Sequence, residues 1–222
     1  MPSPAELVRT VSSVTGVPLP TIVDIDRRLV KGKLRAKGGR GFNAAQMTPL
    51  DAARLIAAVL ASPQANAAAE AVERYAQARV DKTRSSDKLF GAVGLDDLAA
   101  LPAKHSFVDA LTALIASAST GSLAKLIAAS KRGWTPHIEV FAFTRAIRGR
   151  IRIAGLPNGL TASIEYVRAS AGTKASRTRK IGPSRAATND TVGDLEQSRR
   201  VTERTILPIA ALLAPESRND WT

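Results

Sequence analysis

Apolar residues recur every three or four positions through the first 62 residues, a spacing that predicts three short helices. The first covers 5–15 and is expected to end at Gly16, and the second begins at Pro18 or Pro20. The third begins at Thr48-Pro49. The apolar faces of the three helices are formed by Leu7, Val8, Val11 and Val14, by Ile22, Ile25 and Leu29, and by Ala52, Leu55, Ile56, Val59 and Leu60.

Helical spacing continues after residue 62. An alanine-rich helix is expected over 62–79, with Ser62 as its N-cap, and residues 80–105 are polar and broken by glycines and a proline. A further helix starts at Ser106, whose spacing to Asp109 resembles a capping box, and another is expected over 122–131.

The period then changes from about 3.6 to two, which is typical of strands. Strands are expected over 137–143, 149–154 and 160–168, and Pro157-Asn158-Gly159 is expected to turn the last two into a hairpin. A helix over 194–214, interrupted at Pro208, closes the chain. The predicted fold class is therefore α+β, mainly helical, with a small antiparallel sheet. The expected parts are 1–62, a helical connector 63–105, and an α+β domain 106–222 that includes a basic loop at 170–193.

Charge points to the class of partner. The 222 residues hold 32 Lys and Arg against 19 Asp and Glu, a net charge of +13, so an anionic partner is expected and nucleic acid is the first candidate. Cysteine is absent, which excludes disulfides and fits a reducing compartment. The sequence shows no secretory signal pattern and no apolar run long enough to cross a bilayer. We expect a cytoplasmic, nucleoid-associated bacterial protein without membrane contact.

The second helix has the division expected of a recognition helix, apolar inward and polar or cationic outward. Asp24 either accepts a hydrogen bond from cytosine or pairs with a nearby arginine. The segment 35–46 is rich in glycine and basic residues and is interpreted as a wing, which completes a winged helix-turn-helix. From Arg27 to Arg40 there are seven basic residues and no acidic one. The predicted DNA-contacting residues are Thr21, Asp24, Arg27, Arg28, Lys31, Arg35, Lys37, Arg40 and Asn43.

Roughly the first 60 residues resemble a known arrangement. The order of helix, Gly16-Val17 turn, second helix, Gly/Arg-rich segment and Met47-Thr48-Pro49-Leu50-Asp51 is similar to winged DNA-binding domains of the MerR and phage excisionase type. Those domains carry paired aromatic residues after the turn, where this chain has Asp24 and Asp26. The resemblance implies a small regulator carried by phages or integrated elements, with DNA contacts from Arg27, Lys31 and Arg40.

A second basic region lies late in the chain. Residues 145–185 hold ten basic residues and one acidic residue, Glu165. Two readings are open for its latter part: a solubilising loop, or a surface that contacts phosphates without reading sequence. The candidate phosphate contacts are Lys174, Arg177, Arg179 and Lys180.

Candidate chemistry is sparse. His105 and His137 have no carboxylate or cysteine partners at metal-ligand spacing, and we expect His137 to begin a strand. Asp96-Asp97 is expected to cap a helix rather than to act as a catalytic pair. The sequence therefore predicts no enzyme, no metal site and no cofactor.

The resulting hypothesis is a sequence-specific regulator of transcription that binds double-stranded DNA as a homodimer, because one small module rarely contacts enough base pairs. Two alternatives remain open. One is an architectural or packaging protein that binds nucleic acid without sequence preference. The other is a helix-turn-helix adaptor that binds protein.

Overall fold

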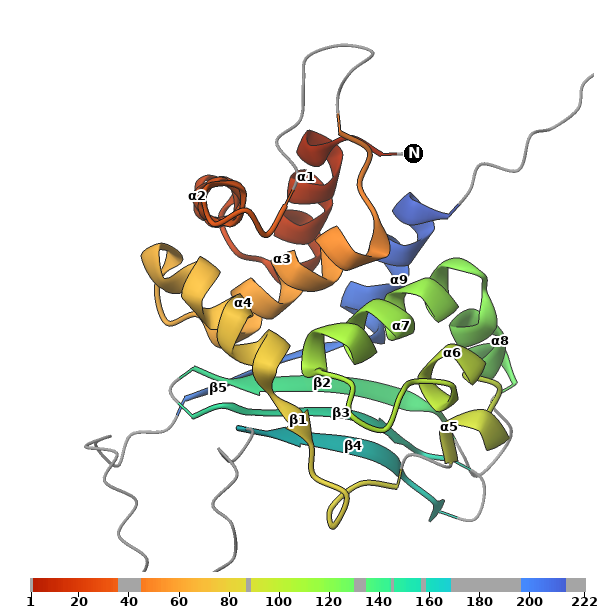
Figure 1. Ribbon diagram of the computed structural model, residues 1–222. Coiled ribbons are helices and arrows are strands. Elements are labelled where there is room, and N and C mark those ends of the chain that lie inside the picture. Colours follow the sequence, from red (N-terminus) through yellow and green to blue (C-terminus); the bar gives the residue numbers. More distant parts are fainter. Residues whose placement is uncertain are drawn as a thin grey trace, which may run out of the picture.

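A computed structural model describes residues 2–35, 45–86, 89–129, 135–144, 146–156, 159–168 and 197–214. Helices cover one face of a five-stranded sheet, and the opposite face carries no helix among these residues (Figure 1). The predicted α+β class with a small antiparallel sheet is confirmed. The helical elements are α1 (Pro4–Thr15), α2 (Leu19–Lys31), α3 (Pro49–Ala61), a 3-10 turn (Ala65–Ala67), α4 (Ala68–Gln77), α5 (Leu89–Ala92), α6 (Asp96–Ala99), α7 (Phe107–Ser119), α8 (Ser122–Ala128) and α9 (Glu203–Leu213).

Three of these helices begin with the same local device, a capping box. The N-cap side chain accepts a hydrogen bond from a backbone N–H three residues on, while the acidic residue there accepts from the N-cap backbone. The pairs are Ser3 with Glu6, Thr48 with Asp51, and Ser106 with Asp109. Gly16 ends α1 with φ of 71°, a left-handed conformation that glycine adopts without strain. The predicted starts of α3 and α7 and the end of α1 are confirmed.

The sheet is antiparallel throughout, in the order β1-β4-β3-β2-β5. Its strands are β1 (Arg79–Val80), β2 (His137–Phe143), β3 (Arg148–Ala154), β4 (Ala162–Val167) and β5 (Ser198–Thr202). Along β3, Ile151 and Ile153 are buried under the helices while Arg150 and Arg152 face the other way. The predicted strands and the β3–β4 hairpin are confirmed, and Gly159 of the turn has φ of 69°.

Aromatic rings join the helices to the sheet. Phe107 of α7 packs edge-on against Tyr75 of α4 and Tyr166 of β4, with ring centroids 5.1 and 5.4 Å away. A Cβ atom added to Gly149 of β3 would lie 2.7 Å from the Phe107 ring, so only glycine permits this approach. The buried rings therefore set how closely α7 lies on the sheet.

The Tyr75 hydroxyl anchors the turn between β2 and β3. It accepts a hydrogen bond from the Phe143 N–H at 2.9 Å and donates toward the Arg148 carbonyl oxygen at 2.6 Å. Burial raises the pKa of Tyr75 to about 12, although its backbone hydrogen bonds act in the opposite direction. Tyr75 of the helical layer thus fixes the end of the sheet at which β2 and β3 are joined.

Two predicted helices differ from the structure. Residue Ser62 is the C-cap of α3, and its hydroxyl donates to the Gln64 carbonyl, so the expected helix over 62–79 is reduced to the 3-10 turn and α4. The described part of the expected helix over 194–214 starts with β5 and becomes helical only at Glu203. Pro208 lies inside α9. The strand was missed because three of its five residues are exposed and only Val201 is buried, so its sequence shows no full alternation.

The segment 80–105 packs against the rest of the chain. β1 pairs with β4, and Phe90, Leu95 and Leu98 belong to the same cluster of buried residues as α1, α3, α7 and the sheet. The described residues of this segment thus contribute to the same hydrophobic core as the helices and the sheet. Among the described residues, no single helix is long and apolar enough to cross a bilayer. Only α7 and α8 taken together, which are bent by 71° relative to each other, have the necessary length and apolar composition.

Candidate nucleic-acid interfaces

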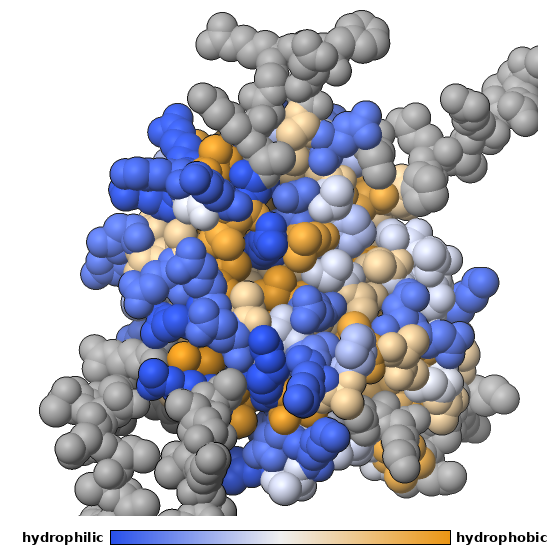
Figure 2. All heavy atoms as spheres, viewed as in Figure 1, coloured by the Kyte–Doolittle hydropathy of each residue, from blue (hydrophilic) through white to orange (hydrophobic). Residues whose placement is uncertain are grey.

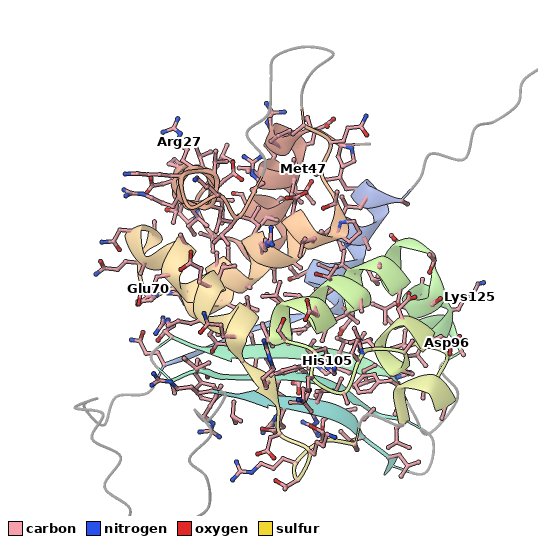
Figure 3. The ribbon with its side chains drawn as sticks, in the orientation of Figure 1. Arg27, Met47, Glu70, Asp96, His105 and Lys125 are labelled. Atoms are coloured by element: carbon pink, nitrogen blue, oxygen red, sulfur yellow. The ribbon has the colours of Figure 1, made fainter. Side chains whose placement is uncertain are left out.

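The α2 face is the outward surface of the second helix, formed by Thr21, Arg27 and Lys31 with Asp24 and Arg28 beside them. Thr21, Arg27 and Lys31 are exposed, whereas Ile22, Ile25 and Leu29 are buried on the opposite side. Helix α2 packs against α1, α3 and α4, and Arg27 points away from the body of the molecule (Figure 3). The predicted division of this helix into an apolar inner side and a polar outer side is confirmed.

Asp24 has a partner within the helix. Its carboxylate lies 3.4 Å from Nε of Arg28, one turn on, and both side chains are nearly half exposed. Of the two readings of Asp24, the intrahelical pair is therefore formed, and it partly neutralises Arg28. The cations of the α2 face that remain outside this pair are Arg27 and Lys31.

Arg35 does not lie on the surface. Its side chain is 6% exposed, and its guanidinium forms an ion pair with Asp26 of α2 and lies 4.0 Å from the Met47 sulfur. This placement does not fit the prediction that Arg35 contacts DNA from a wing, because a buried arginine paired with a carboxylate cannot reach phosphate without breaking that pair. Arg35 instead ties the chain after α2 to the segment that precedes α3.

The other predicted contacts fall outside the described residues. These are Lys37, Arg40 and Asn43 of the expected wing, and Lys174, Arg177, Arg179 and Lys180 of the expected basic loop. Next to α2, the outer side of α4 exposes Glu70 and Glu73. Hydrophilic side chains cover the flank formed by α2 and α4 (Figure 2). The α2 face is thus a short basic surface with acidic residues on one side.

The second candidate surface is the open sheet face, the side of β2–β5 that the helices do not cover. Alternation along each strand and the strand register bring its residues together. The face contains Glu139, Phe141 and Phe143 of β2, Arg148, Arg150 and Arg152 of β3, Glu165 of β4, and Arg200 of β5.

Arginines flank both phenylalanine rings. Phe141 stands opposite Arg150 on one side and Arg200 on the other, and the Arg200 guanidinium carbon lies 5.9 Å from the ring centroid. The guanidinium carbon of Arg148 lies 5.0 Å from the centroid of Phe143. Both distances are within cation–π range. Half-buried aromatic rings and guanidinium groups thus share one surface.

Two carboxylates hold the arginines in place. Glu139, whose side chain is 10% exposed, accepts from Arg152 at 3.3 Å and from Arg200 at 2.9 Å. Glu165 pairs with Arg150 at 2.6 Å. The side chains of Arg150, Arg152 and Arg200 are nevertheless 40, 39 and 53% exposed. Since each guanidinium carries five N–H donors, these pairs leave donors directed to solvent.

Contacts of the Glu203 carboxylate at the end of β2 tie the sheet to α9. Glu203 accepts from the Ile138 N–H at 3.0 Å and lies 2.9 Å from Nδ1 of His137. Burial acts to raise the pKa of Glu203. The hydrogen bonds from its own N–H and from the Ile138 N–H, together with the contact with His137, outweigh burial, so the pKa lies below its usual value. His137 begins β2 as predicted.

His105 has a structural environment. Its Nδ1 lies 2.7 Å from the Pro102 carbonyl oxygen, so it donates there, and Nε2 then accepts from the Tyr166 hydroxyl at 2.8 Å. Asp97 accepts from Ser117 and, with Asp96, lies in the first turn of α6. The described residues contain no group of three or more His, Cys, Asp and Glu side chains placed to hold a metal ion.

No protein-family model, curated protein or solved structure matches this chain. Its surfaces must therefore be interpreted from their own chemistry. Helical periodicity in the sequence predicts the α2 face. The alternation of Arg150 and Arg152 with isoleucines is also visible in the sequence, but their position beside Phe141 and Phe143 was not predicted. The period-two pattern of β2, in which Phe141 and Phe143 alternate with Val140 and Ala142, is the signal that could have found them.

Proposed function

We propose that the protein is a sequence-specific regulator that binds double-stranded DNA by inserting the α2 face into the major groove. The observation that carries this proposal is an ordered, amphipathic helix whose buried side is fixed by α1, α3 and α4 and whose outer side exposes Thr21, Arg27 and Lys31. A helix with its side chains is about 10–12 Å wide, which fits a major groove of about 12 Å.

The residues of the α2 face divide into two roles. Arg27, directed away from the body, reads a guanine edge through its planar guanidinium, and Thr21 lies in the first turn of the same helix. Lys31 and Arg28 neutralise phosphates and set the orientation of the helix on the duplex. Because Asp24 already holds Arg28, its own pairing with cytosine is not part of the proposal.

The wing and the homodimer predicted from the sequence belong to the same proposal. The wing predicted over 35–46, most of which lies outside the described residues, completes a winged helix-turn-helix, and two copies of the chain bind two half-sites. A single recognition helix with three exposed polar side chains reads only a few base pairs, so a homodimer supplies the remaining specificity.

The test combines selection of bound fragments from random duplex DNA with one substitution. Arg27→Ala is expected to reduce the preference for the selected sequence over random duplex by about 1–3 kcal/mol, because one bidentate base contact is lost. The measurement is competitive binding at several salt concentrations. Arg204→Ala is the matched control, since Arg204 is an exposed arginine on α9.

The two alternatives give different results in this experiment. Selection that enriches no sequence, with all duplexes weakened alike by salt, indicates an architectural protein. Absence of duplex binding at moderate salt favours the adaptor. An Arg27→Ala variant that keeps the full sequence preference would show that α2 is not the recognition helix.

A further inference from the structure

We infer that the open sheet face is a separate binding site for single-stranded nucleic acid, with Phe141 and Phe143 as stacking platforms for two bases. This inference goes beyond duplex binding by α2, because it uses different residues on another side of the molecule. It requires three properties of the face: aromatic surfaces at suitable spacing, excess positive charge, and a shape that a duplex does not fit.

The aromatic surfaces come from one strand. Phe141 and Phe143 are two residues apart on β2, so their Cα atoms lie about 6.6 Å apart and their side chains leave the sheet on the same side. Both rings are half-buried rather than enclosed in the core. A half-buried pair of rings on a strand inside the sheet offers faces on which successive unpaired bases stack, which is a recurring mode of single-strand recognition.

Positive charge surrounds the two rings. Strands β2–β5 place four arginines on this face against Glu139 and Glu165, which leaves two positive charges in excess among the described strand residues. The Arg148 guanidinium lies over the Phe143 ring, and the Arg200 guanidinium lies over the Phe141 ring. A base that stacks on one of these ring faces takes the place of the guanidinium, which is then within reach of the phosphate of that nucleotide.

The carboxylates also contribute to the site. Glu139 holds Arg152 and Arg200 from two different strands, and Glu165 holds Arg150. Each pair limits the rotamers of a long side chain before the ligand arrives, so less conformational entropy is lost on binding. Glu139 itself is 10% exposed and lies beneath the arginines, where it is shielded from an approaching phosphate.

The shape of the face favours a single strand over a duplex. The four strands β5, β2, β3 and β4 span about 14 Å between the outer strand axes, and their side chains add to this width, whereas the major groove is about 12 Å wide. The faces of paired bases are hidden inside a duplex, so phenylalanine rings gain no stacking there. The excess of arginines likewise disfavours pairing of two copies through this face, because like charges would meet.

The test measures binding of fluorescent oligothymidylate of about 12 nucleotides, a length within the usual range for one such site. Phe141→Leu and Phe143→Leu keep an apolar side chain at each position but remove the aromatic face. We expect each leucine variant to bind the oligonucleotide about ten-fold more weakly than the native protein. The Phe141→Tyr variant keeps an aromatic ring and should bind within about two-fold of the native affinity. Leu160→Ala, at an exposed apolar residue outside the face, is the matched control.

A second readout detects stacking directly. The fluorescence of a 2-aminopurine base within the oligonucleotide should change on binding to the native protein and to the Phe141→Tyr variant. It should not change with the double variant that carries both Phe141→Leu and Phe143→Leu. Arg27→Ala should leave single-strand binding unchanged, which separates this inference from the proposed role of α2.

Three results would overturn the inference. The first is equal affinity of the leucine variants and the native protein for the oligonucleotide. The second is loss of single-strand binding on Arg27→Ala to the same extent as on Phe141→Leu. The third is a native dimer that dissociates on Phe141→Leu, since the face would then be an interface between two copies of the chain.

Discussion

The α2 face and the open sheet face are both basic, but they are built differently. On α2, Arg27 and Lys31 extend from one helix, and the acidic residues Glu70 and Glu73 lie on the neighbouring α4. On the sheet, arginines from β3 and β5 converge on two phenylalanines of β2, and two glutamates hold them. Positive charge alone does not distinguish the two surfaces. The neighbours of each cation decide whether it can enter a groove or lie beside a stacked base.

The two surfaces share one core, and the largest expected effect tests this connection. Phe107 contacts Tyr75, Tyr166 and the Gly149 backbone between the helical layer and the sheet. Phe107→Ala should lower the free energy of unfolding by about 3–5 kcal/mol, because it removes a large buried ring and leaves a cavity. Denaturant titration followed by circular dichroism should show one transition, shifted as a whole. Two separate transitions would mean that the α2 region and the sheet region are independent units.

A smaller effect distinguishes Arg35 from the exposed arginines. Asp26→Asn should cost about 3 kcal/mol of folding stability, since it leaves the nearly buried Arg35 guanidinium without its carboxylate partner. Asp24→Asn is the matched control on the same helix and should cost less than about 1 kcal/mol, because its pair with Arg28 is solvent-exposed. Equal effects in urea titrations of the two variants would contradict the buried role assigned to Arg35.

The smallest effect concerns pH at the end of β2. Because the pKa of Glu203 lies below its usual value in the folded protein, its ionised carboxylate stabilises the fold above the unfolded pKa of about 4.5, and this contribution is lost as pH falls through the folded pKa. Glu203→Gln should therefore lower the free energy of unfolding at pH 7, by less than about 1 kcal/mol. Once the pH lies below the folded pKa of Glu203, the native protein and the variant should converge. A difference that persists at low pH would contradict the ionic origin of this contribution.

The two surfaces also differ in how their cations are paired with carboxylates. Glu139 and Glu165 position the arginines of the open sheet face, whereas on α2 only Arg28 depends on a carboxylate. Arg27 and Lys31 are exposed, and neither forms an ion pair with an acidic side chain of the described residues.

The sequence by itself determined the elements whose signals are local. Capping boxes at Ser3, Thr48 and Ser106 supply their own hydrogen bonds, and the Ile and Arg residues of β3 alternate within one strand. Capping boxes and helical faces depend on residues three or four positions apart, and strand alternation depends on residues two positions apart. No contact between distant residues is needed to recognise these patterns. The inner and outer sides of α2 were predictable for the same reason.

Only the tertiary structure decided which basic residues share a surface. Strand β5 forms because the edge of β2 accepts it, although just Val201 of its five residues is buried. Arg35 is interior because Asp26, nine residues earlier, meets it there. Arg200 reaches Phe141 across about sixty residues of sequence through strand pairing. The physical reason is that pairing between distant strands and burial of charge depend on contacts between residues far apart in the chain, which periodicity does not encode.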